Sequence, residues 1–192
     1  MRHIERGGLH FRVCDPSWTD PLDTSFARQQ GGRWNPAGSF GVLYLCATIS
    51  VAAGNARRAY EGEIATLFDL LPEHRPDLQL VNVMPLRFVD AATDDGLRSL
   101  RLPLTYPLGV SWVRCQAIGA RAYGREEYGI ACRSADAAGH SNITIEGEEL
   151  VVFDRAVRYA TRLERVPFAK WYPVEVGETP EWVKRRLMGR DE

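Results

Sequence analysis

The 192-residue sequence lacks most of the short patterns that would assign a chemistry directly. Its four cysteines show no metal-ligand spacing such as C-x-x-C and its four histidines are scattered, so we expect no metal site. It contains no G-x-S-x-G elbow of a serine hydrolase, no G-x-G-x-x-G and no phosphate-binding loop. A dinucleotide would therefore bind as a substrate and not as a cofactor in a Rossmann cleft.

Long apolar runs and an excess of charge are missing as well. No run reaches the roughly 18 apolar residues of a membrane span, and the start MRHIER shows no apolar signal segment. A formal net charge of -1 gives no electrostatic case for binding nucleic acid or an anionic membrane. We therefore expect a cytoplasmic protein that has no membrane association and binds no nucleic acid directly.

The composition is that of an ordinary globular domain, with 45% hydrophobic and 26% charged residues. Strands and helices mix irregularly along the chain, which favours an α+β fold: one domain over 1–192, with a mixed β-sheet core and flanking helices. Strands are expected at 9–13, 42–47, 78–84, 128–132, 142–145 and 150–153. Helices are expected at 51–71, at 90–100 with Asp90 as cap, at 110–123, and from Thr179 onward.

The most informative stretch is GGRWNPAG at 31–38, followed by the apolar run VLYLC at 42–46. Paired glycines let the backbone take unusual dihedral angles or approach a ligand closely. The guanidinium of Arg33 is a planar fork that suits phosphate or carboxylate. We expect Trp34 to pack this loop against the core and not to touch a ligand.

These two strings resemble the signature of the RES-domain proteins, the toxins of many bacterial toxin–antitoxin pairs. The resemblance covers about 9–153, and we expect 154–192 to be a C-terminal extension packed on the same domain. It implies a fold similar to that of the ADP-ribosyltransferase toxins. It also implies that NAD is the substrate, with no prosthetic group and no metal.

Five residues match positions of the family pattern. Arg33 and Tyr44 lie in the two strings above, and Ser134 lies in the stretch CRSA at 132–135. Asn55 occupies the position of the family's glutamate, on the helix after Tyr44, and Arg12 matches an arginine of the first strand. The resemblance implies that Arg33, Asn55 and Ser134 are catalytic. It implies that NAD is bound by Arg12, Arg33, Tyr44 and Ser134.

These residue types suit the cleavage of the bond between nicotinamide and ribose. The leaving group is already cationic and needs no acid, so the barrier lies in the developing oxocarbenium ion, as in glycoside cleavage. Arginines at 12 and 33 would hold the pyrophosphate, and the Tyr44 ring would stack on nicotinamide. Ser134 and Asn55 would bond the ribose hydroxyls or the carboxamide.

Asn55 departs from the family pattern because it keeps hydrogen-bonding capacity but loses the carboxylate charge. Glu61 and Glu63 follow on the same expected helix, but helical geometry places neither beside Asn55. If the helix presents Asn55 to the ribose, Asn55→Glu should restore the charge and raise cleavage. A carboxylate stabilises the cationic transition state more than the ground state.

Three functions remain open on the sequence alone. The first is a toxin that transfers ADP-ribose from NAD to water or phosphate, blocked by a cognate Xre-type antitoxin protein. The second uses the same site to ADP-ribosylate a protein. The third, suggested by Asn55, is a non-catalytic module for NAD binding or protein interaction. The sequence does not decide whether the chain forms a homo-oligomer.

Overall fold

The strands of the computed structural model form one mixed sheet, which confirms the expected fold class. The structure describes residues 1–58, 60, 62–64, 66–135 and 147–172. Its strands are β1 (His3–Cys14), β2 (Val42–Cys46), β3 (Asp77–Ala91), β4 (Gly129–Arg133), β5 (Glu148–Phe153) and β6 (Ala160–Val166). Its α-helices are α1 (Ser25–Gln30), α2 (Ile49–Arg58), α3 (Asp94–Ser99), α4 (Trp112–Gly124) and α5 (Phe168–Trp171). Short 3₁₀ helices cover Pro72–His74 and Asp154–Tyr159.

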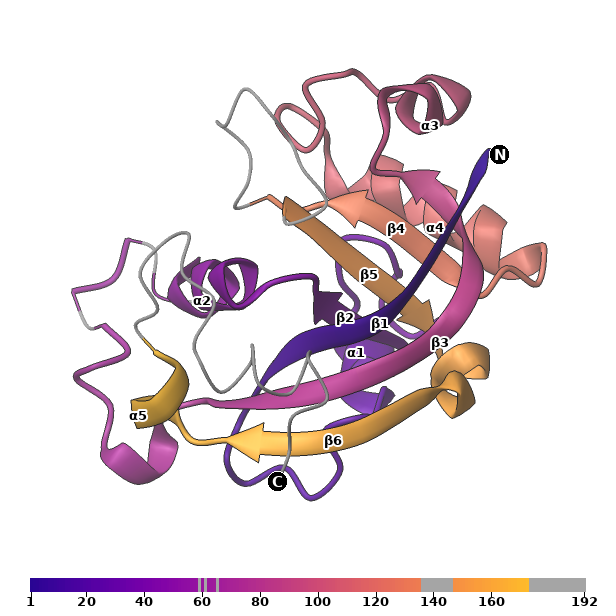
Figure 1. Cartoon of the computed structure of the whole chain (residues 1–192). Coiled ribbons are helices and arrows are strands. Elements are labelled where there is room, and N and C mark those ends of the chain that lie inside the picture. Colours follow the sequence, from indigo (N-terminus) through magenta and orange to yellow (C-terminus); the bar gives the residue numbers. More distant parts are fainter. Residues whose placement is uncertain (59, 61, 65, 136–146, 173–192) are drawn as a thin grey trace.

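The strand order is β1-β2-β5-β4-β3-β6, and β1 also pairs with β3. In Figure 1, β1, β3 and β6 run side by side, and β4 and β5 lie next to each other beyond them. Only the β3–β4 pairing is parallel among the described strands. β5 is central, because it pairs with β2 on one side and with β4 on the other.

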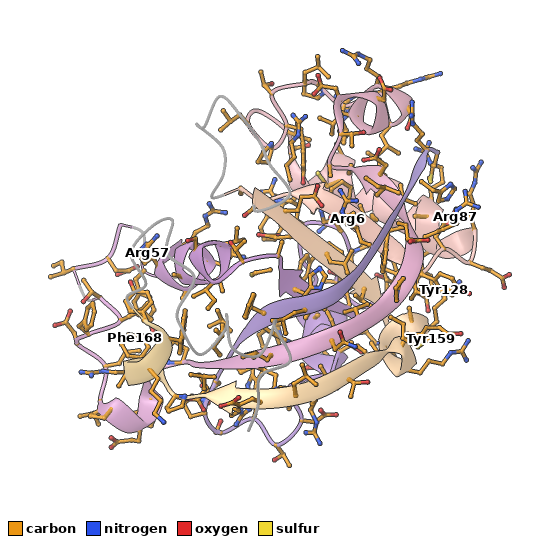
Figure 2. The ribbon with its side chains drawn as sticks, viewed as in Figure 1. Arg6, Arg57, Arg87, Tyr128, Tyr159 and Phe168 are labelled. Carbon is orange, nitrogen blue, oxygen red and sulfur yellow. The ribbon has the colours of Figure 1, made fainter. Side chains whose placement is uncertain are left out.

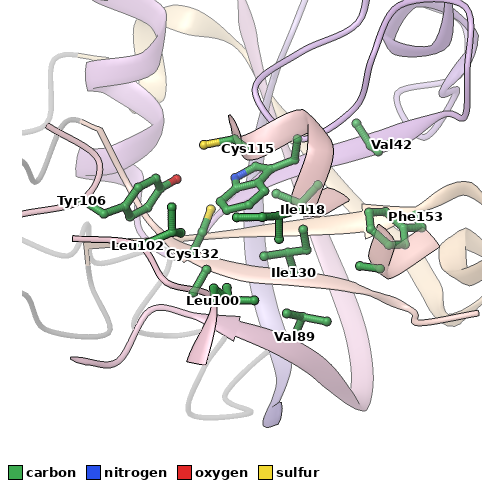
Figure 3. Close-up of a cluster of buried hydrophobic side chains, with 14 of the residues drawn as sticks. Val42, Val89, Leu100, Leu102, Tyr106, Cys115, Ile118, Ile130, Cys132 and Phe153 are labelled. Carbon is green, nitrogen blue, oxygen red and sulfur yellow. The ribbon is translucent and has the colours of Figure 1, made fainter. Parts of the chain in front are cut away.

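Alternation along the strands separates two faces of the β2-β5-β4 layer. One face carries Leu43 and Leu45 of β2 with Leu150 and Val152 of β5, all in one buried cluster. The opposite face is covered by helices and loop 31–38, and its cluster includes Trp34 with residues of β2, β4, β5 and α4. Figure 3 shows Cys115, Cys132 and Tyr106 together at one end of this second cluster, and Val42 and Phe153 at the other.

The helix α4 lies close to its predicted position, and its first turn has a local cap. Ser111 accepts a hydrogen bond from the backbone N–H of Arg114, and the helix ends at Gly124. Its buried residues are Cys115, Ile118, Gly119 and Ala122, and the side chains of the first, second and fourth pack in the cluster that covers the sheet. The expected helix at 110–123 is therefore confirmed with small shifts at its ends.

Two helix predictions need correction. The helix expected over 51–71 ends at Arg58, and the described residues from there to 71 form turns, bends and irregular backbone. A 3₁₀ turn at Pro72–His74 follows. Asp90 does not cap a helix, because it lies inside β3. Thr93 is the cap of α3, accepting a bond from the Gly96 amide, while the Asp90 carboxylate binds the amides of the turn between strand and helix.

Several elements are longer than the sequence indicated, or were not expected. β1 and β3 extend well beyond 9–13 and 78–84, because they pair with each other from His3↔Val89 to Cys14↔Asp77. α1, β6 and α5 were not predicted, and in β6 most of the side chains are exposed, which leaves little apolar pattern. The strand predicted at 142–145 and the helix predicted from Thr179 lie outside the described residues.

Candidate functional site

The loop at 31–38 has a local geometry that requires its glycines. Gly31 has a φ of 74°, which L side chains rarely adopt. A Cβ on Gly32 would lie 2.6 Å from the Tyr44 hydroxyl oxygen, so only glycine at this position lets the tyrosine reach the loop. Trp34 is fully buried, which confirms that it packs the loop on the core.

The Tyr44 hydroxyl joins this loop to β2. It accepts a hydrogen bond from the backbone N–H of Trp34 at 3.0 Å and donates one to Oδ1 of Asn35 at 3.1 Å. The Asn35 amide in turn donates to the carbonyls of Ala27 and Phe40. Tyr44 therefore holds the loop in place through its hydroxyl.

Arg33 sits between two buried residues of this loop and is itself partly exposed. Its guanidinium lies 5.9 Å from the ring centroid of Trp112, at the start of α4. The Gln116 amide of the same helix donates to the Gly32 carbonyl at 2.9 Å. The structure thus places the predicted arginine at the junction of loop and helix, with an exposed indole beside it.

Asn55 and Ser134 meet at a residue that the sequence analysis did not select. The Asn55 amide nitrogen donates to Oε1 of Glu149 at 2.9 Å, and the Ser134 hydroxyl donates to the same oxygen at 3.0 Å. The Asn55 amide also lies 3.4 Å from the sulfur of Cys46. A carboxylate is therefore present beside Asn55, although it comes from β5 and not from α2.

The register of the sheet explains this meeting. Glu149 pairs with Cys46 on one side and with Cys132 on the other, so it lies between the ends of β2 and β4. Ser134 follows Cys132 by two residues and shares its face, since side chains alternate along a strand. Tyr44 precedes Cys46 by two residues and shares that face as well.

Arg33 and Glu149 act electrostatically on the same buried groups. Burial raises the pKa of Tyr44, the Glu149 carboxylate adds to that rise, and the Arg33 guanidinium opposes it. Burial likewise raises the pKa of the Cys132 thiol, with the same opposite effects of Glu149 and Arg33. Arg33 on the loop at 31–38 and Glu149 on β5 thus act on Tyr44 with opposite charges.

Arg12, the other arginine predicted to bind NAD, does not lie with this group. Phe11 pairs with Cys46 and packs in a cluster with residues of α2, so the adjacent side chain of Arg12 points to the other face of the sheet. Its guanidinium donates to the carbonyl of Pro21 and lies 5.2 Å from the Trp18 ring centroid. These contacts tie the loop that follows β1 to the strand.

The structure therefore brings together Tyr44, Asn55 and Ser134 on one face, with Arg33 on the adjoining loop. The residue that sequence reasoning missed is Glu149. In the sequence, Glu149 belongs to the acidic stretch EGEE at 146–149, a pattern typical of a solvated turn.

Within the described ranges, no group of three or more His, Cys, Asp or Glu is placed to hold a metal ion. No described helix is both long and apolar enough to cross a membrane.

The RES domain family model matches residues 10–171, and the chain belongs to that family. The match extends past residue 153, where the resemblance seen in the sequence ended.

Among curated proteins, the chain is similar to NAD(+) phosphorylase MbcT of Mycobacterium tuberculosis (strain H37Rv) and of Mycobacterium bovis. Each is 28% identical over 120 residues, which is 62% of this chain and 64% of the relative. The match thus spans less than two thirds of these relatives. Among solved structures, the chain resembles the crystal structure of the M. tuberculosis MbcT–MbcA toxin–antitoxin complex, with a TM-score of 0.70, 24% identity and 86% of each chain covered.

Proposed function

We propose that this protein is a toxin that cleaves the bond between nicotinamide and ribose in NAD. The observation that carries the proposal is the meeting of the Arg33 loop, Tyr44 and the Asn55–Glu149–Ser134 group on one side of the sheet. Membership of the RES family and similarity to proteins named NAD(+) phosphorylase support it.

In this proposal, each group has a task that suits its chemistry. Arg33 binds the pyrophosphate through its planar fork, and the ring of Tyr44 stacks on nicotinamide. Ser134 and Asn55 bond to ribose hydroxyls or to the carboxamide, in addition to orienting Glu149. When the C–N bond breaks, its electron pair leaves with nicotinamide, and the ribosyl carbon becomes an oxocarbenium ion.

The acceptor that captures this ion determines the product. Attack by inorganic phosphate gives ADP-ribose phosphate, and attack by water gives ADP-ribose and a proton. We favour phosphate, because the curated relatives are named phosphorylases. By the same reasoning we propose an antitoxin protein as partner, since the structural neighbour was solved in a toxin–antitoxin complex.

The test is to incubate the purified protein with NAD, with and without inorganic phosphate, and to separate the products by chromatography and mass spectrometry. We expect nicotinamide release in both cases and ADP-ribose phosphate when phosphate is present. A mass increase on added proteins, without free ADP-ribose products, would instead support protein ADP-ribosylation. Binding of NAD without any nicotinamide release would refute the enzyme and support a binding module.

A further inference from the structure

We infer that the Glu149 carboxylate, on β5, supplies the negative charge that faces the ribosyl cation, with Asn55 and Ser134 orienting it. This inference rests on the proposed NAD cleavage and names the residue that would stabilise its transition state. The sequence pattern sought such a carboxylate on α2, where Asn55 now stands.

The first support is the way Glu149 is held. Donors from two separate segments, the Asn55 amide on α2 and the Ser134 hydroxyl after β4, converge on one carboxylate oxygen at 2.9 and 3.0 Å. An ionised carboxylate only accepts hydrogen bonds, so two converging donors match the charged form. Such fixed groups stabilise a developing charge without reorganising during the reaction.

The position of Glu149 in the sheet also supports this role. Glu149 lies on the central strand of the β2-β5-β4 layer, on the face that carries Tyr44 and Ser134. Its charge and that of Arg33 both act on Tyr44 and Cys132. A carboxylate held on this face is suited to stabilise the positive charge that develops on the ribosyl carbon when the C–N bond breaks.

The third support is the contrast with the neighbouring glutamate. Glu148 is buried on the other face and forms a 2.8 Å ion pair with Arg6 of β1. Figure 2 labels Arg6 on β1, where the strand passes close to the upper strands of the sheet. Glu148 is therefore held by Arg6 on the other face, and it is not the carboxylate that Asn55 and Ser134 contact.

The geometry also reverses the expectation for Asn55→Glu. That single change would place a second carboxylate where an amide now donates to Glu149 at 2.9 Å. Like charges at hydrogen-bond distance repel, and one of them must take up a proton or move away. We now expect Asn55→Glu alone to slow cleavage and not to accelerate it.

The exchange variant Asn55→Glu/Glu149→Asn keeps one carboxylate, one amide and the combined length of the two side chains. It should therefore preserve both the hydrogen bond and the charge, with the charge on α2. Glu149→Gln keeps the shape of the side chain and removes only the charge. Glu148→Gln is the matched control, because it removes the adjacent carboxylate from the opposite face.

The experiment measures kcat for nicotinamide release and the dissociation constant of carba-NAD, an analogue that cannot form the ribosyl cation. We expect Glu149→Gln to lower kcat at least about 100-fold, with carba-NAD binding changed by less than about threefold. The exchange variant should recover at least about a tenth of the wild-type rate. Glu148→Gln should lower the melting temperature while the folded protein keeps its kcat.

The possible failures are distinguishable. If the wild-type protein releases no nicotinamide, the proposed function is wrong and the inference falls with it. If the wild type is active and Glu149→Gln is equally active, only the inference is wrong. An exchange variant that folds but stays as slow as Glu149→Gln would also overturn it, since the charge would then not be the property that matters.

Discussion

Replacing Tyr44 with phenylalanine tests whether its hydroxyl holds the Arg33 loop. The change leaves the ring in place and removes the acceptor of the Trp34 amide and the donor to Asn35. A buried N–H without a partner costs about 1–3 kcal/mol, and the lost bond to Asn35 adds about 1 kcal/mol. We therefore expect the free energy of unfolding to fall by about 2–4 kcal/mol.

For a chain of this length, such a loss corresponds to a fall in melting temperature of roughly 5–15 °C. Thermal denaturation followed by circular dichroism measures it directly. The control is Tyr159→Phe, since the described part of the chain shows no hydrogen bond to the Tyr159 hydroxyl and its ring contacts that of Tyr128, as Figure 2 shows. Equal melting temperatures for the Tyr44 variant and the control would refute the reasoning.

Three further predictions concern other parts of the structure. Arg33→Ala should reduce nicotinamide release by about 100-fold. Arg33→Lys should be nearly as slow, because a point charge does not replace the bidentate fork. A fully active lysine variant would contradict phosphate binding by the fork. Gly119→Ala should lower the free energy of unfolding, measured by urea titration, by about 3 kcal/mol or more, because its Cβ would lie 1.8 Å from the Trp34 carbonyl oxygen. The control is Gly124→Ala on the same helix, whose Cβ meets no atom within 4 Å and should leave that free energy unchanged. Burial lowers the pKa of His10 from 6.5, so the folded state favours the neutral ring and stability is lost as the pH falls below that value. His10→Gln should therefore flatten the fall in melting temperature between about pH 7.5 and 5.5. An unchanged slope would exclude His10 as the source of this pH dependence.

The sequence was most informative where structure depends on neighbouring residues. The cap of α4 at Ser111 and the apolar run of β2 are local features, and both elements were predicted close to their observed bounds. The helix expected over 51–71 was too long, because local propensity does not show where a helix loses its partner in the fold. The ends of β1 and β3 were not predicted for a similar reason, since the length of these two strands comes from their pairing with each other.

The candidate site divides in the same way. The sequence by itself determined the loop at 31–38, because the glycines, Trp34 and Asn35 are needed for its own conformation. It also determined the RES family, because that loop and β2 carry the signature.

Only the tertiary structure decided which carboxylate lies beside Asn55 and on which face Arg12 projects. Glu149 is 94 residues from Asn55 along the chain, and their contact depends on the register of β5 between β2 and β4. A shift of one residue in that register would turn Glu149 away and bring Glu148 to its place. Strand pairing over such distances is set by the packing of the whole sheet, which no local pattern encodes.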